Sequence, residues 1–150
     1  MERINKSKHY ITYGDKKYNA HSFERIRYNN IYDGIDVLFE LHPKGGLEYT
    51  LFLAPGADIQ KIKFSYKGQK SLSLEGNKKI VLQTDIEDMW EGNIHAFYKN
   101  GESIGMQYAL ANDIISFEPQ GNIDPNRSLV IDPWVTTNTS LSGSPGATGG

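Results

Sequence analysis

The segment IDVLFELHPKGGLEYTLFL, residues 35–53, decides the fold class of this chain. Its large apolar residues fall at every second position on both sides of a short break. They are Ile35, Val37, Phe39 and Leu41 before the break, and Leu47, Tyr49, Leu51 and Leu53 after it. A period of two places each set on one face of a β-strand. The Pro and Gly residues of 43–46 favour a chain reversal, so the segment predicts an antiparallel hairpin.

The opposite face of this hairpin is not uniformly polar. Leu38 and Phe52 lie on it, among Asp36, Glu48 and other polar residues. Apolar residues on both faces indicate that a second layer covers part of the hairpin. The sequence therefore predicts an all-β, antiparallel, sandwich-like module built of successive hairpins.

The rest of the chain continues the same alternation of short apolar strands and turn residues. Further strands are predicted at 62–66, 72–74, 80–82, 94–98, 104–110, 114–117 and 129–131. Asn100-Gly101 favours a hairpin between strands 94–98 and 104–110, and Asp132-Pro133 is expected to end the last strand. Residues 57–61 are the best helical candidate and could form at most one turn.

Three regions are predicted along the chain. Residues 1–22 form an N-terminal extension with a small hairpin around Gly14-Asp15, and residues 23–135 form the β-rich module. Residues 136–150 consist mostly of Thr, Ser, Gly and Asn and are interpreted as a linker or the truncated start of a following domain.

Composition excludes several classes of function. The net charge is −2, so no strong positive field favours nucleic acid as a partner. The chain has no cysteine, which excludes disulfides and thiolate metal sites. No apolar run is long enough for membrane insertion or for a signal peptide, and the residues alone leave the compartment open.

Three short motifs carry a resemblance to a known family. They are YNNIYDGID at 28–36, LAPGAD at 53–58 and SLVIDPW at 128–134. Their order and spacing resemble the uncharacterised β-rich module that precedes SBBP-type β-propeller repeats in large secreted or surface-attached bacterial proteins, several of which end in a gliding-motility-type sorting domain. The segment 84–98 departs from the family pattern, because it lacks the usual proline followed by Tyr-Gln.

The resemblance implies an architectural role and an extracellular or cell-surface location. It implies a non-enzymatic module that packs against a following β-propeller of the same polypeptide. Leu129, Ile131 and Trp134 are the residues expected at that domain interface, since they stand where the module meets the first blade. The family brings no catalytic or ligand-binding residues with it, and no cofactor is expected.

Two binding hypotheses come from the residues themselves. Asp85, Glu87, Asp88 and Glu91 are dense enough to suggest calcium, although an acidic loop that keeps a sheet edge soluble is the commoner explanation of such a segment. Trp90 and Tyr98 could stack on a sugar, which would make the module an adhesion module for polysaccharide or another surface.

An enzyme is the least favoured class. Asp36 and Glu48 are expected to face each other across the first hairpin, as the two carboxylates of a glycoside hydrolase would. The sequence Gly101-Glu102-Ser103-Ile104-Gly105 matches the G-x-S-x-G nucleophile pattern, but no helix follows it, so it is interpreted as a coincidence. The four histidines are scattered, which argues against a zinc site.

Overall fold

The computed structural model describes residues 1–13, 18–42 and 46–137, and these residues form an all-β fold. The elements are β1 (Glu2–Tyr13), β2 (Tyr18–Tyr32), β3 (Ile35–Leu41), β4 (Leu47–Leu53), η1 (Ile59–Lys61), β5 (Lys63–Phe64), β6 (Ser71–Glu75), β7 (Lys79–Gln83), β8 (Met89–Tyr98), β9 (Met106–Ala111), β10 (Ile114–Pro119) and β11 (Leu129–Thr137). The element η1 is a single 3-10 turn. No helix in these described ranges is long and apolar enough to cross a membrane.

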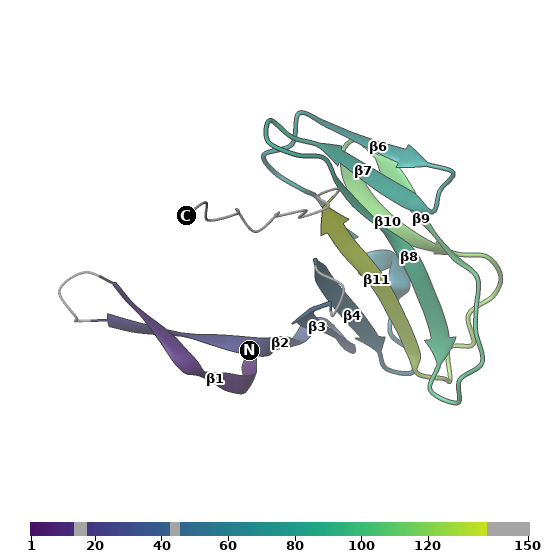
Figure 1. Cartoon of the computed structure of the whole chain (residues 1–150). Coiled ribbons are helices and arrows are strands. Elements are labelled where there is room, and N and C mark those ends of the chain that lie inside the picture. Colours follow the sequence, from purple (N-terminus) through teal and green to yellow (C-terminus); the bar gives the residue numbers. More distant parts are fainter. Residues whose placement is uncertain (14–17, 43–45, 138–150) are drawn as a thin grey trace, which may run out of the picture.

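The strands form two antiparallel sheets of unequal size. The large sheet has the order β1-β2-β3-β4-β11-β8-β7-β6, and the small sheet has the order β5-β10-β9. Figure 1 shows the β1–β2 ribbon projecting away from the two-layered body. The large sheet therefore extends well beyond the strands that the small sheet can cover.

The core lies between the two sheets. The large sheet contributes Ile35, Val37, Leu51, Leu53, Ile80, Leu82, Ala96, Tyr98, Leu129 and Ile131, and the small sheet with η1 contributes Ile59, Ile62, Met106, Tyr108, Ile115 and Phe117. The alternation of buried and partly exposed residues along β7, β9 and β10 follows from the two-residue period of a strand. The predicted sandwich-like, all-β fold is confirmed.

The hairpin of residues 35–53 forms as the sequence predicts. Strands β3 and β4 pair from Ile35 opposite Leu53 to Leu41 opposite Leu47, with all eight alternating apolar residues on one face. Residues 43–45 of its turn lie outside the described residues. The β6–β7 hairpin and the helical turn at η1 are also confirmed.

The hairpin predicted around Asn100-Gly101 is confirmed only next to its turn, where Phe97 forms an antiparallel bridge with Ser103, and the predicted pairing of 94–98 with the rest of 104–110 is wrong. The turn itself forms, with Tyr98 N–H donating to the Glu102 carbonyl at 2.8 Å and Ile104 N–H to the Ala96 carbonyl at 2.9 Å. The chain then crosses to the other sheet, where β9 pairs with β10, while β8 pairs with β7 and β11. A turn signal determines a local reversal, but it does not determine which sheet the next strand joins.

The last strand does not end at Asp132-Pro133. Strand β11 continues to Thr137, which also overlaps the start of the predicted linker. The pairing with β8 shifts register between Asp132 and Trp134, so an irregularity accommodates the proline that cannot donate to the ladder. The remaining linker residues, 138–150, lie outside the described residues.

The N-terminal extension is larger than predicted. Strands β1 and β2 pair from Glu2 opposite Arg27 to Tyr13 opposite Tyr18, although the turn residues 14–17 lie outside the described ranges. Strand β2 passes without interruption through the expected boundary at residues 22 and 23. Extension and module are thus joined by one continuous strand.

Candidate functional site

An open apolar groove lies where the small sheet ends and the large sheet continues. Its volume is about 730 Å³, and its lining comes from the inner faces of β3 and β4, from the segment around β5, and from the end of β11. The lining includes Val37, Phe39, Leu41, Leu47, Tyr49, Ile62, Phe64, Tyr66, Met89, Val135 and Thr136. At its rim, Leu41 is 75% exposed and Ile31 is 40% exposed. These side chains are positioned by the alternation of residues 35–53.

A fully buried carboxylate lies between the two sheets, next to the inner end of the groove. Glu91 on β8 accepts hydrogen bonds from Tyr49 Oη at 2.5 Å, from Tyr108 Oη at 2.8 Å and from Tyr66 Oη. Tyr49 belongs to β4, Tyr108 to β9, and Tyr66 follows β5. One side chain thereby connects three strands of the large and small sheets, and two of its partners also line the groove.

Burial controls the electrostatics of this cluster. Removal from water raises the pKa of Glu91, and the three tyrosine hydroxyls oppose that shift only in part. The same burial, together with the neighbouring Glu91, raises the pKa of Tyr49 and Tyr108, so both phenols remain hydrogen-bond donors at neutral pH. The arrangement is suited to hold two sheets together, because every polar group in it has a partner.

The structure does not bring the four calcium candidates together. Glu91 points into the core toward the tyrosines, whereas Asp85 is an exposed residue that pairs with Lys70. Within the described ranges, no three His, Asp or Glu side chains are placed to hold a metal ion. Asp85, Glu87 and Asp88 precede β8, whereas Glu91 lies within it with its side chain in the core, so their nearness in sequence does not bring all four carboxylates together.

Two of the three residues expected at a domain interface lie in the core. Leu129 is 2% exposed and Ile131 is 0% exposed, and both pack between the sheets. Their side chains share the inner face of β11 and cannot reach a following domain. Trp134 lies on the other face. Its ring stacks on the His42 ring, with 4.2 Å between the ring centres, and meets the Trp90 ring edge-on, with 5.5 Å between the ring centres.

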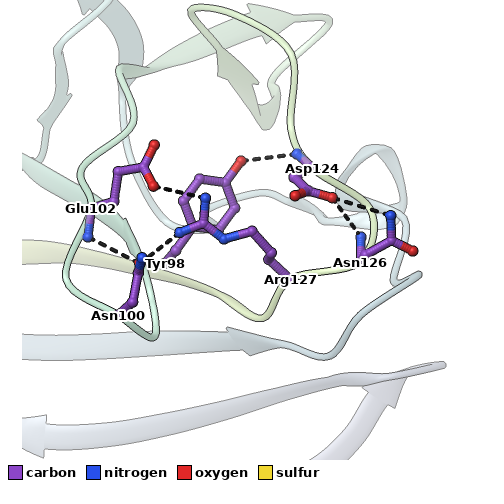
Figure 2. Close-up of polar contacts among 6 residues, drawn as sticks. All are labelled: Tyr98, Asn100, Glu102, Asp124, Asn126 and Arg127. Atoms are coloured by element: carbon purple, nitrogen blue, oxygen red, sulfur yellow. Dashed lines mark hydrogen bonds and ion pairs between the residues drawn. The ribbon is translucent and has the colours of Figure 1, made fainter.

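Tyr98, one of the two predicted sugar platforms, is covered by its own module. The Arg127 guanidinium lies 3.8 Å from the Tyr98 ring centre and donates to Asn100 Oδ1 at 2.6 Å and to Glu102 Oε2 at 2.7 Å. The Tyr98 hydroxyl accepts from the Asp124 N–H at 2.9 Å. Figure 2 shows this clamp, which fixes the loop before β11 onto the β8–β9 turn. Tyr98 therefore has a structural role.

Trp90, the other predicted platform, borders a second cavity. That cavity has a volume of about 630 Å³ and is also lined by Asn93, Gln120 and Lys79. Lys79 Nζ lies 5.8 Å from the Trp90 ring centre. An aromatic ring beside amide groups and a cation is a chemically reasonable surface for a polar ligand such as a sugar.

The two carboxylates expected to face each other do not. In the β3–β4 register Asp36 is opposite Phe52, and Glu48 is opposite Glu40. Four strand positions separate the two carboxylates, which corresponds to about 13 Å and exceeds both glycosidase spacings. Asp36 instead pairs with Arg27 at 2.7 Å, which lowers its pKa.

Glu48 has a different neighbour. It lies near Asp132 of β11, and its pKa is raised by burial and by the negative charge of Asp132. Thr50 Oγ1 donates to Asp132 Oδ1 at 3.2 Å on the same face. The outer face of β4 and β11 therefore joins residues that lie more than 80 positions apart in the sequence.

The first two family motifs meet in space and serve the fold. Ala54 N–H donates to the Gly34 carbonyl at 2.8 Å, and Gly56 N–H donates to the Pro125 carbonyl at 2.7 Å. Asp58 caps η1 by accepting from Gln60 N–H at 3.0 Å. These turn residues are explained by backbone hydrogen bonds at one end of the sandwich.

Sequence reasoning missed both the groove and the Glu91 cluster. The alternation of β3 and β4 indicates an apolar face, but it does not say how far a second sheet covers that face. Sequence proximity groups Glu91 with the acidic residues before it. The signal for its burial is that Glu91, unlike them, lies within a strand that contains apolar residues, in a chain rich in tyrosines that can donate hydrogen bonds to a buried carboxylate.

Fold and site together define a two-sheet antiparallel β-module with an uncovered apolar groove. The chain belongs to a family described as a domain of unknown function, DUF7948, whose profile matches residues 1–134. No curated protein and no solved structure matches the chain significantly.

Proposed function

We propose that this chain is a non-enzymatic structural module of a larger extracellular protein, and that it packs against the domain that follows it. The resemblance of its three motifs to the module before SBBP-type repeats supports a β-propeller as that domain. The groove beside β5 is the observation that carries the proposal, because an open apolar groove with Leu41, Leu47 and Ile31 exposed at its rim suits contact with another domain.

The position of the last strand also supports a following domain as the partner that covers the groove. Val135 and Thr136, near the end of β11, line the groove. Any domain joined after β11 is therefore tethered at the rim of the groove, where its effective concentration is high. Covering the groove would also protect the edge of β5 from pairing with other chains.

The first test is to sequence the coding region on both sides of this segment at its native locus. The proposal expects the reading frame to continue into repeats. Start and stop codons that bound this chain would contradict both the surface location and the packing role.

Leu41→Asp tests the groove in the longer polypeptide. The side chain is 75% exposed here, so the change should alter the free energy of unfolding of this chain by less than about 1 kcal/mol. Covered by a following domain, the new charge would lie in an apolar contact and cost about 2 to 3 kcal/mol. Denaturant unfolding of the variant and the unaltered protein, in this chain and in the longer polypeptide, measures the difference.

Ile86→Asp is the matched control, because Ile86 is 97% exposed and is not among the residues that line the groove. Ile86→Asp should change the free energy of unfolding of this chain and of the longer polypeptide by the same amount. The proposal fails if Leu41→Asp also has the same effect in the short chain and in the longer polypeptide.

A second candidate function is adhesion to polysaccharide through the Trp90 cavity. The observation that favours it is the partly exposed Trp90 ring beside Asn93, Gln120 and Lys79. This candidate and the packing role use different surfaces, so one protein could have both.

The polysaccharide candidate predicts that added glycan changes tryptophan fluorescence in a saturable way. Trp90→Ala should weaken that binding about tenfold, because an aromatic contact contributes roughly 1 kcal/mol or more. Ile86→Ala should leave it unchanged. A titration with a panel of neutral and acidic polysaccharides that shows no saturable change for the unaltered chain would exclude this function.

A further inference from the structure

The small sheet stops one strand short of covering the large sheet. Strand β5 pairs only with β10, through Phe64 opposite Ile115 and Lys63 opposite Ser116, and no described strand pairs with its other edge. Past that edge, the inner face of β3 lines the groove with Val37 and other apolar residues. The space has the position that a fourth strand of the small sheet would occupy.

One backbone group of β5, the Lys63 carbonyl, lies on the groove side of the strand, where a side-chain hydroxyl is its hydrogen-bond partner. Tyr32, at the groove rim, donates its hydroxyl to the Lys63 carbonyl at 3.2 Å. This carbonyl therefore points away from β10 and toward the groove. An edge of this kind favours an extended segment, which satisfies backbone groups and inserts alternate side chains at the same time.

The directions of the strands also fit a returning chain. The segment after η1 begins at Lys63, which contacts Tyr32 at the end of β2, opposite the first residue of β3. It reaches Tyr66, which contacts Glu91, and Glu91 is opposite Val135 of β11. Strand β11 runs in the same direction, from Leu129 opposite Leu53 to Val135 opposite Leu47. A chain that reverses after β11 would therefore run antiparallel to β5.

The linker is long enough for this reversal. Residues 138–150 contain Leu141 as their only large apolar residue, so their composition does not match a strand with apolar residues at every second position. Thirteen residues can span roughly 40 Å when extended. Under the proposed function, the strand is therefore assigned to the domain that follows these residues.

We propose that the first strand of the following domain adds to the free edge of β5 and completes the small sheet, with alternate apolar side chains on Val37, Phe39 and Leu41. This inference rests on the proposed function and specifies its mode of contact. The occupant is an extended strand with apolar residues at every second position, because the groove is apolar and the β5 edge offers backbone pairing.

Amide hydrogen exchange by mass spectrometry tests the inference in the native polypeptide that continues past residue 150. The same measurement on this 150-residue chain is the reference. Strand addition predicts that amides of residues 62–66 exchange roughly tenfold more slowly, or slower still, in the longer polypeptide. Amides of β6 at the opposite edge of the large sheet serve as the internal control and should not change.

A second measurement separates strand addition from other contacts. The chain has no cysteine, so Leu41→Cys gives a single thiol in the groove of this chain, and the longer polypeptide receives the same substitution. Strand addition predicts slow alkylation of this thiol together with slow exchange at 62–66. Slow alkylation with unchanged exchange overturns strand addition but retains domain packing, whereas no change in either overturns both proposals.

Discussion

Replacing Glu91 with alanine is expected to lower the free energy of unfolding by about 3 to 5 kcal/mol. The change removes the carboxylate that accepts from Tyr49, Tyr66 and Tyr108 and leaves three hydroxyls in the core with unmet hydrogen bonds. It also leaves a cavity between the sheets, at a residue that is 0% exposed. Chemical denaturation followed by tryptophan fluorescence measures the loss.

Two other variants make this result specific. Glu91→Gln retains the volume and one acceptor oxygen, so it should cost less, about 1 to 2 kcal/mol. Glu118→Ala removes an exposed glutamate from the small sheet and should stay within about 0.5 kcal/mol. An alanine variant at 91 that is as stable as the variant at 118 would show that the buried cluster does not hold the sheets together.

The same cluster gives the stability a pH dependence with a definite sign. Burial raises the pKa of Glu91 above its ordinary value of 4.5, so the folded chain binds this proton more tightly than the unfolded chain. The contribution of this protonation to the free energy of unfolding is therefore complete below pH 4.5 and decreases as the pH rises through the pKa of Glu91 in the folded chain. Relative to Glu91→Gln, the unaltered chain should lose stability as the pH increases above that value.

Replacing Gly46 with alanine is expected to cost about 3 kcal/mol or more. Gly46 has a φ of +88°, and a β-carbon there would lie 2.2 Å from the Val135 carbonyl oxygen and 3.1 Å from Trp134 Nε1. Neither the backbone of β11 nor the stacked Trp134 ring can move without disturbing the sheet. Thermal unfolding measures the loss.

Gly101→Ala is the matched control for this prediction. Gly101 has nearly the same φ, +89°, but no atom lies within 4 Å of the position of an added β-carbon. It should therefore cost only the conformational part, about 1 to 2 kcal/mol. Equal losses at 46 and 101 would mean that the close approach to β11 contributes nothing.

Local pattern predicted most of the strands but not all of their partners. The register of β3 on β4 follows from eight alternating residues and a turn, because a slip by one position would expose the whole apolar face. Strands β8 and β9 carry an equally strong turn between them, yet they belong to different sheets. The difference lies in contacts between distant segments, which no turn signal encodes.

The candidate sites show the same division between local and distant information. Trp90 could be selected from sequence as a surface aromatic, and it does border a cavity. Tyr98 could not be distinguished from it, because Arg127 and Asp124, which cover Tyr98, follow it by more than 20 residues. Leu129 and Ile131 were placed at an interface by their motif, although strand alternation directs them into the core.

By itself, the sequence determined the all-β class, the hairpins with local turns and the apolar faces of the strands, since periodicity and turn chemistry act over a few residues. Only the tertiary structure decided that Glu91 meets three tyrosines and that the small sheet leaves the end of β3 at Leu41 uncovered. The physical reason is that burial and sheet membership are set by contacts between strands far apart in the chain, and an alternating strand looks the same whether its apolar face is covered or open.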